Sequence, residues 1–253
     1  TLLMKFEEAY STFDKENHTI KKIQNIYIKT PITFAENYKE SFLCPNCRLA
    51  KLQYNNAATP YFSAYPHAKH TPDCYLQQKE LSPKSAESFV QNSQNTPVLL
   101  RQMQSIINSL LPSHSLSSSK NQVLPTTIAI PSSSHTSKSS QNKRMTQKRF
   151  DLPLRIEDYN CYKYFYGKSR IKWEYDNRIK KHKLLLRNIE DNTFLGRIFI
   201  TPSVYQYLSE EYKAPLEYSC YIVFAAKLSK TDKNYFEGTL YRSNHMIITK
   251  FSE

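Results

Sequence analysis

Glycine is scarce in this sequence. Only three glycines occur among 253 residues, at positions 167, 196 and 238, so the first two thirds of the chain contain none. A phosphate-binding loop needs several glycines at fixed spacing, and none of the three stands in a GxGxxG or GxxxxGKS context. We therefore do not expect an enzyme that binds a nucleotide through such a loop.

Long apolar runs are also lacking. The sequence has no continuous apolar stretch of about 18 residues, the length that a membrane-spanning helix needs. Its first residues, Thr1-Leu2-Leu3-Met4-Lys5, do not show the basic and then apolar layout of a signal peptide. Hydrophobic residues nevertheless make up 40% of the chain, which is enough to form cores. We expect a cytoplasmic protein with no membrane partner.

Acidic residues are missing from the middle of the chain. Residues 88–150 contain seven basic and no acidic side chains, whereas residues 1–87 and 151–253 carry net charges of +2 and +4 within a total of +13. A basic excess of this size favours a polyanionic partner. Nucleic acid is preferred over a membrane because no basic amphipathic helix with a bulky aromatic face is present. The alternative is that the charge only keeps the surface soluble.

Composition divides the chain into three regions. We predict a zinc-binding module at residues 1–81, a basic Ser-rich linker at residues 82–150 and a folded domain at residues 151–253. Eleven of the residues from Ser113 to Ser140 are serine, which is typical of a flexible, disordered linker.

One amphipathic helix is predicted inside the linker, at residues 97–111. Thr96 and Pro97 supply a cap and a first helical residue, and Leu99, Met103 and Ile106 recur at helical spacing. An apolar stripe is costly to leave in water. This helix therefore either docks on one of the protein's own domains or binds a protein partner in a groove, and the sequence leaves both open.

A short hairpin is predicted near the N-terminus. Residues 4–11 partly alternate between apolar and polar side chains, and residues 14–17 favour a turn. The apolar residues Ile20, Ile23 and Ile26 then continue the chain toward the first cysteine.

The C-terminal region has the pattern of short strands around one helix. Strands are predicted at residues 159–166, 170–175, 183–187, 194–200, 218–227, 235–241 and 246–251, and a helix from Thr201-Pro202-Ser203 to Glu211. This order matches an OB-fold, a small Greek-key barrel. We predict an α+β, mostly β protein that ends in an OB-like β-barrel, although a generic small α+β domain would show the same order.

Two pairs of metal-ligand residues point to zinc. Cys44-Pro45-Asn46-Cys47 is followed by Cys74, with His67 and His70 between them. Three thiolates and one imidazole complete the tetrahedral coordination of a structural zinc and leave no position for a water nucleophile. We prefer Cys44, Cys47, His70 and Cys74 as ligands, because His70 and Cys74 fall on one face of a turn, while His67 stays open as the alternative. Cys161 and Cys220 lie in apolar strands and are expected to be buried thiols.

This segment resembles a known family. The stretches Phe42-Leu43-Cys44-Pro45-Asn46-Cys47, Tyr61-Phe62-Ser63-Ala64-Tyr65-Pro66 and His70-Thr71-Pro72-Asp73-Cys74 are similar to the N-terminal zinc-binding module of the competence protein CoiA-like family of bacterial proteins. The resemblance covers about residues 5–80 and implies a small metal-stapled module in DNA uptake or mobile-element biology. Relatives often carry a nuclease-like domain afterwards, and that motif is not found here.

Basic and aromatic residues are interleaved between Tyr162 and Arg187. A cationic groove with aromatic faces is the combination that single-strand binders use, because cations follow the phosphates while rings stack on bases. The predicted binding residues are Lys163, Tyr164, Tyr166, Lys168, Arg170, Lys172, Trp173, Arg178, Lys180, Lys181, Lys183 and Arg187. Tyr164 or Trp173 is the preferred stacking ring. The alternative is that the aromatics form the core of a barrel and the lysines its wet exterior.

These observations favour a non-enzymatic protein that binds nucleic acid, with single-stranded DNA preferred, in a competence, mobile-element or defence context. One alternative is a protein-interaction adaptor or regulator. The other is a divergent nuclease, which needs an Asp and a Glu-x-Lys to hold a divalent cation. The acidic segments Glu174-Tyr175-Asp176 and Glu237-Gly238-Thr239 lack that lysine.

Overall fold

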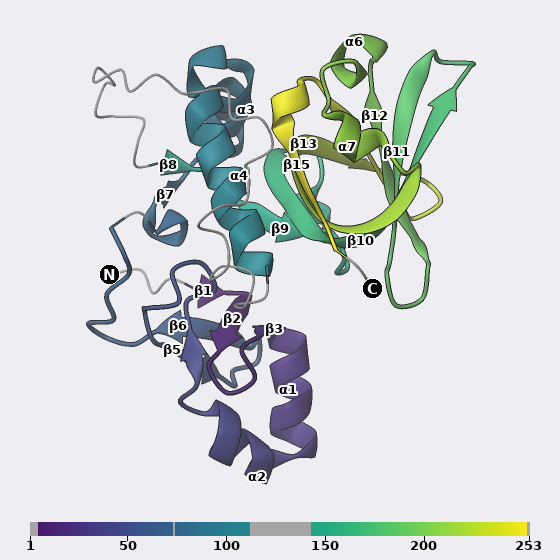
Figure 1. Cartoon of the computed structure of the whole chain (residues 1–253). Coiled ribbons are helices and arrows are strands. Elements are labelled where there is room, and N and C mark those ends of the chain that lie inside the picture. Colours follow the sequence, from purple (N-terminus) through teal and green to yellow (C-terminus); the bar gives the residue numbers. More distant parts are fainter. Residues whose placement is uncertain (1–4, 73, 112–142, 252–253) are drawn as a thin grey trace. The chain divides into compact units, whose positions relative to one another are not determined.

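The computed structural model describes residues 5–72, 74–111 and 143–251 (Figure 1). Residues 112–142, which include the serine-rich stretch of the predicted linker, lie outside the described residues. The chain divides into two compact units, each described by itself. The N-terminal unit holds the described residues 5–72, 74–77 and 109–111, and the C-terminal unit holds residues 78–108 and 143–251.

Parts of the predicted linker are folded. Residues 83–91 and 96–110 form helices, and residues 143–144 and 147–149 form strands. Residues 78–108 and 143–150 belong to the same compact unit as the barrel, so the C-terminal unit begins before residue 82 and is larger than the predicted domain at 151–253. The folded part carries large apolar side chains at helical spacing, such as Phe89, Leu99 and Met103, and all three are buried.

Two small antiparallel sheets build the N-terminal unit, in the orders β3-β2-β4 and β1-β6-β5. Phe42, Leu52 and Phe62 are fully buried in its core. Its elements are β1 (Lys5–Phe6), β2 (Glu8–Ser11), β3 (Asn17–Thr19), α1 (Ile20–Lys29), α2 (Pro31–Thr33), η1 (Phe34–Tyr38), β4 (Phe42–Leu43), β5 (Leu52–Asn55), β6 (Tyr61–Ala64) and η2 (Tyr75–Gln77).

The predicted N-terminal hairpin is confirmed, but the isoleucines after it form a helix. β2 and β3 pair antiparallel, with Ala9 opposite His18. The chain then enters α1, where the Thr19 hydroxyl caps the helix by accepting a hydrogen bond from the backbone of Lys22. Ile20, Ile23 and Ile26 are spaced by three, which suits one face of a helix, and Ile23 is fully buried.

The C-terminal unit has more elements. They are β7 (Lys79–Glu80), α3 (Pro83–Gln91), η3 (Ser93–Asn95), α4 (Thr96–Leu110), β8 (Lys143–Arg144), β9 (Gln147–Arg149), η4 (Ile156–Asp158), β10 (Tyr162–Asp176), β11 (Lys181–Arg187), β12 (Phe194–Ile200), α6 (Pro202–Tyr205), α7 (Glu210–Lys213), β13 (Glu217–Lys230), β14 (Phe236–Leu240), η5 (Ser243–His245) and β15 (Met246–Lys250). Among the described residues of the whole chain, no helix combines the length and the apolar character needed to cross a bilayer.

Five strands of this unit close into a barrel. β10 pairs with β11, β11 with β12, β12 with β14, β14 with β13, and β13 returns to β10. All of these pairs are antiparallel except β12–β14, which is parallel. β15 and β9 extend the sheet beside β13 and β10. The structure therefore confirms a mixed, mostly β fold with a closed barrel in the C-terminal region.

Alternating side chains fill the barrel. On β11, Leu184 and Leu186 are fully buried, and on β12 so are Ile198 and Ile200, while the residues between them face outward. Gly196 lies opposite Phe236 in the parallel pair, where a Cβ would collide with the Phe236 ring. The barrel can therefore close at this point only with the smallest residue.

The predicted strands and helix of this region differ in detail from the observed ones. Residues 162–176 form one long strand, β10, instead of two, because its first part pairs with β13 and its last part with β11. The helix predicted from Thr201 begins as expected, with the Thr201 hydroxyl accepting from Val204 N, but it breaks into the short helices α6 and α7.

The predicted amphipathic helix is confirmed as α4. Leu99, Met103, Ile106 and Ile107 are buried, and Gln102 lies on the same side. The Gln102 amide donates to Gln78 Oε1 at 2.9 Å and to the Lys143 carbonyl at 2.8 Å. Residues 96–108 of this helix therefore pack within the C-terminal unit itself, which is the docking in cis that the sequence left open.

Candidate metal centre and nucleic-acid interface

Four side chains of the N-terminal unit converge on one point. The ligand atoms of Cys44, Cys47, His70 and Cys74 all lie within 4.8 Å of one another. Cys44 Sγ is 3.9 Å from Cys74 Sγ, and His70 Nδ1 is 3.4 Å from Cys47 Sγ and 3.3 Å from Cys74 Sγ. No disulfide joins these cysteines, and the cluster could hold a metal ion.

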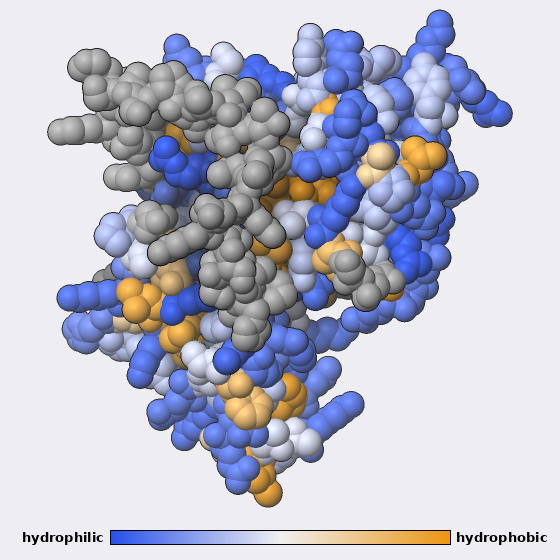
Figure 2. Space-filling model, in the orientation of Figure 1, coloured by the Kyte–Doolittle hydropathy of each residue, from blue (hydrophilic) through white to orange (hydrophobic). Residues whose placement is uncertain are grey.

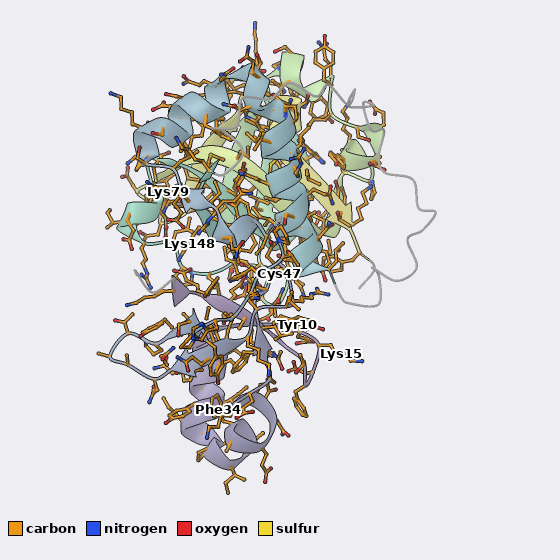
Figure 3. All side chains as sticks on the ribbon, turned by 90° about the vertical axis from the view of Figure 1, so that its left-hand side faces the viewer. Tyr10, Lys15, Phe34, Cys47, Lys79 and Lys148 are labelled. Carbon is orange, nitrogen blue, oxygen red and sulfur yellow. The ribbon has the colours of Figure 1, made fainter. Side chains whose placement is uncertain are left out.

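The local backbone places the first two cysteines. Cys44 N donates to the Ala50 carbonyl at 2.8 Å, and Arg48 N donates to the Cys44 carbonyl at 2.9 Å, so residues 44–50 form a tight turn. Arg48 has a positive φ of 51°, which closes the turn, and its guanidinium stacks 4.5 Å above the Tyr10 ring. Cys47 and Tyr10 are both labelled in Figure 3.

The second loop is tied to the first by an amide. Asn46 Oδ1 accepts a hydrogen bond from the backbone of Tyr75 at 2.9 Å, next to Cys74. Cys74 N donates to the Thr71 carbonyl at 3.0 Å, so the chain turns between His70 and Cys74 as the spacing predicts. His70 lies 6.2 Å from the Phe6 ring, which packs against it.

His70, and not His67, joins the three cysteines. His67 has a positive φ of 68° and lines a surface groove with Tyr65 and Lys69. Within the described residues, the cysteine cluster contains His70 as its single imidazole. The structure therefore supports the preferred ligand set over the alternative.

The electrostatics of the cluster favour the thiolate at Cys47 and Cys74 and the thiol at Cys44. Hydrogen bonding from Cys44 lowers the pKa of the Cys47 thiol to about 3, helped by the backbone amides of Ala50 and Thr71. Hydrogen bonding from Cys44 also lowers the pKa of Cys74, whereas Cys47 and Cys74 raise the pKa of Cys44. Without a cation, one buried sulfur must therefore keep its proton, and a divalent ion would replace that proton.

The two remaining cysteines differ from each other. Cys220 is fully buried in β13, as predicted. Cys161 is only partly buried and donates to the Glu157 carbonyl at 3.5 Å, so the prediction of a buried thiol is wrong at this position. Neither belongs to the cysteine cluster.

The aromatic residues predicted to stack on bases are core residues. Tyr164 is 0% exposed, Trp173 is 4% exposed and Tyr166 is 5% exposed. Trp173 Nε1 donates to the Tyr212 carbonyl at 2.6 Å. A base cannot reach these rings in the folded state, so the stacking role predicted for Tyr164 or Trp173 is wrong.

Three of the predicted cations are held by acids. Lys163, Lys172 and Lys183 form ion pairs with Asp158 (2.7 Å), Glu174 (3.1 Å) and Asp176 (3.1 Å) respectively. Lys163 and Asp158 are also nearly buried, which makes that pair structural. Glu174, considered as a nuclease acid, is likewise engaged by lysines. The positive charges of these three lysines are therefore compensated by neighbouring carboxylates.

The other predicted cations are better placed to meet a polyanion. Arg178, Lys180 and Lys181 lie in and after the turn between β10 and β11 and have no acidic partner within the described part of the chain. Lys168 is exposed, 5.5 Å above the Tyr221 ring. Arg170 lies directly opposite Arg187 in the sheet, and the Arg187 guanidinium donates to the Asn192 carbonyl at 3.1 Å.

Sequence reasoning missed the rings on the outer face of β12. Arg197 lies 5.1 Å from the Phe199 ring and 5.4 Å from the Tyr235 ring, and Arg187 lies 5.9 Å from the Phe194 ring. These three rings are half-buried. The alternation of residues 194–200 could have placed Arg197 and Phe199 on one face, but Tyr235 comes from the connection between β13 and β14, which only the closed barrel brings near.

The outer face of β11 and β12 thus combines cations with accessible rings. We call this surface, made by Arg178, Lys180, Lys181, Arg187, Arg197, Phe194, Phe199 and Tyr235, the β11–β12 face. Figure 2 shows that the visible side of the barrel is mostly hydrophilic. Acids lie beside this face as well: Arg197 Nε donates to Glu237 at 2.7 Å, and Asp176, which pairs with Lys183, lies opposite Lys181.

Comparison with family models, with curated proteins and with solved structures gives no match to this chain.

Proposed function

We propose that the C-terminal barrel is an OB-fold that binds single-stranded nucleic acid on its β11–β12 face. The order β10-β11-β12-β14-β13, closed by β13 on β10, corresponds to the 1-2-3-5-4-1 circuit of OB barrels. Two further features support this assignment. The β12–β14 pair is parallel, and the short helices α6 and α7 lie between the third and fourth barrel strands.

One observation carries the binding function. The β11–β12 face combines three half-buried rings with Arg178, Lys180, Lys181 and Arg187, which form no ion pair among the described residues, whereas Arg197 on the same face is paired with Glu237. OB-folds bind oligonucleotides on their second and third strands and on the loops next to them, which here are β11, β12 and residues 177–180 and 231–235. Cations there would follow the phosphates, and Phe199 and Tyr235 would stack on bases.

The N-terminal unit is proposed to hold zinc. Zn–S bonds of about 2.3 Å and Zn–N bonds of about 2.0 Å in a tetrahedron place two sulfurs about 3.8 Å apart and a sulfur and a nitrogen about 3.5 Å apart. The Cys44–Cys74 distance of 3.9 Å and the His70–Cys47 distance of 3.4 Å fit these values. Cys44, Cys47, His70 and Cys74 would hold the ion, which would tie two loops together and would have no open position for catalysis.

The biological setting is proposed from the resemblance alone. The similarity of residues 5–80 to the zinc module of CoiA-like proteins supports a role in bacterial competence, mobile elements or defence. Single-stranded DNA is the preferred ligand in that setting, because DNA uptake produces it.

Binding across a salt series tests the proposed function. Labelled single-stranded and double-stranded DNA and RNA are titrated with the full chain at increasing salt. We expect single strands to bind more tightly than duplexes, with an affinity that falls steeply as salt rises, because phosphate contacts release counterions. Binding to none of the four nucleic acids would disprove the proposal.

A protein-interaction adaptor is the second candidate. Its support is a group of exposed apolar side chains in and after α1, where Ile28 is 65% exposed and Ile32 is 73% exposed. Figure 2 shows apolar side chains gathered at the end of the molecule where α1 and α2 lie. Large exposed apolar residues that cluster often mark protein interfaces. If the chain binds none of the four nucleic acids in the salt series, this role is favoured.

A further inference from the structure

A groove of about 770 Å³ lies between α3 and the barrel, all of it within the C-terminal unit. Its volume is in the range of small-molecule sites, roughly 300 to 1,000 Å³. We call it the α3 groove. The side chains that matter below are Glu87 from α3, Tyr162 from β10, Phe199 from β12, Lys227 from β13, and Tyr241 and Arg242 after β14.

The lining mixes rings with polar groups of both signs. Tyr241 is 63% exposed and Phe199 is half-buried, so both rings are open to a ligand. Lys227 is exposed and has no ion pair among the described residues. Arg242 donates to the Gln91 carbonyl of α3 at 2.7 Å, which fixes one end of the groove. Rings beside separate cations suit a nucleotide, in which a flat base is joined to a phosphate.

Glu87 makes the groove favour a ligand edge that carries hydrogen-bond donors. It is half-buried in the wall and has no ion pair with a described residue. Burial raises the pKa of Tyr162, and Tyr241 and Glu87 add to this effect, so the three side chains lie near one another. A carboxylate only accepts hydrogen bonds. It therefore favours a base edge with two adjacent donors, which guanine presents at N1 and N2 and thymine does not.

Phe199 connects the groove with the β11–β12 face. It lies opposite Lys183 of β11 and Thr239 of β14, and Arg197 packs on its ring at 5.1 Å. Phe199 thus belongs to both surfaces. A strand that crosses the β11–β12 face reaches the groove without leaving the barrel.

We infer that the α3 groove holds one nucleotide of the bound single strand and prefers guanine. Phe199 and Tyr241 contact the base, Glu87 accepts hydrogen bonds from its edge, and Lys227 and Arg242 meet the adjoining phosphates. This inference rests on the proposed function of the barrel and adds a base preference to it.

Two oligonucleotides test the inference. Fluorescence anisotropy compares an all-thymidine strand of twelve nucleotides with the same strand carrying one central guanine. The parent chain is expected to bind the guanine strand roughly fivefold or more tightly. Glu87→Gln is expected to remove this preference, because the amide no longer offers two acceptors. Glu190→Gln is the matched control, since Glu190 is an exposed carboxylate outside the groove, and it should keep the preference.

A second variant tests the contact between the base and the Tyr241 ring. Tyr241→Ala is expected to weaken both strands roughly fivefold or more, because one stacking surface is lost. Its ring is mostly exposed, so the fold should persist, and the fluorescence of Trp173, the sole tryptophan, checks this for every variant.

The outcomes separate the two claims. If the parent binds single strands but shows no guanine preference, or if Glu87→Gln keeps that preference, the inference is overturned and the proposed function stands. If the parent binds no single strand, both are overturned.

Discussion

The Tyr164 hydroxyl donates a hydrogen bond of 2.8 Å to Gln102 Oε1. It links the first part of β10 to α4, and both side chains are buried. Tyr164 is therefore a core residue that fixes a helix to the barrel sheet. The bond explains two features together, namely why this ring cannot stack on a base and how residues 96–108 dock.

Replacing Tyr164 by Phe should lower stability and leave nucleic-acid binding unchanged. The ring still fills its place, but the buried Gln102 oxygen loses this donor, at a cost of about 1 to 3 kcal/mol in the free energy of unfolding. Denaturant unfolding followed by Trp173 fluorescence measures the loss. A variant as stable as the parent would contradict the structural role of this hydroxyl.

The metal prediction concerns the N-terminal unit. The purified chain should carry one zinc, and Cys44→Ser or Cys74→Ser should lose the metal and unfold this unit, because a small module obtains much of its folding free energy from the ion. Elemental analysis and circular dichroism provide the measurement. Cys161→Ser is the matched control and should keep the metal, since Cys161 is outside the cluster. A metal-free chain whose N-terminal unit still unfolds cooperatively would disprove the prediction.

Replacing His70 and replacing His67 should have different effects on zinc binding. His70→Ala should weaken zinc binding at least about tenfold, because Nδ1 lies 3.3 Å from Cys74 Sγ and would be a direct ligand. His67→Ala should bind zinc as the parent does, since His67 lies in a surface groove. Competition with a coloured chelator measures both affinities. Equal losses in the two variants would contradict the ligand set.

The sequence predicted features that depend on local spacing. The convergence of Cys44, Cys47, His70 and Cys74, the helix α4 and most of the strands along the C-terminal region follow from short-range patterns. The role of Tyr164 does not, because β10 is covered on both sides: Tyr164 and Phe165 are both fully buried, so alternation does not identify a wet face. The pairing of Lys163 with Asp158 and the approach of Tyr235 to Arg197 likewise depend on loops and strand pairs that spacing does not reveal.

Acid should destabilise the C-terminal unit through His245. Burial lowers the pKa of this imidazole to about 4, with help from Arg242, so the folded state binds fewer protons than the unfolded state. Stability is therefore fully present above about pH 6.5 and is lost as the pH falls toward 4. His182, whose pKa burial also lowers, acts in the same direction.

Trp173 fluorescence in denaturant at several pH values measures this effect. His245→Gln should show a weaker dependence on pH between about 6.5 and 4.5, because one depressed imidazole is removed. An unchanged slope in this variant would mean that other groups cause the acid sensitivity.

The salt dependence of single-strand binding tests the central claim most directly. Replacing Arg178, Lys180 and Lys181 by Ala should weaken binding to all single strands and reduce the slope of log affinity against log salt by about two, since each phosphate contact contributes about 0.7. The matched control replaces Lys21, Lys29 and Lys39, three exposed lysines of the N-terminal unit, and should leave the slope unchanged. Equal slopes for the parent and the Arg178/Lys180/Lys181 variant would contradict binding on the β11–β12 face.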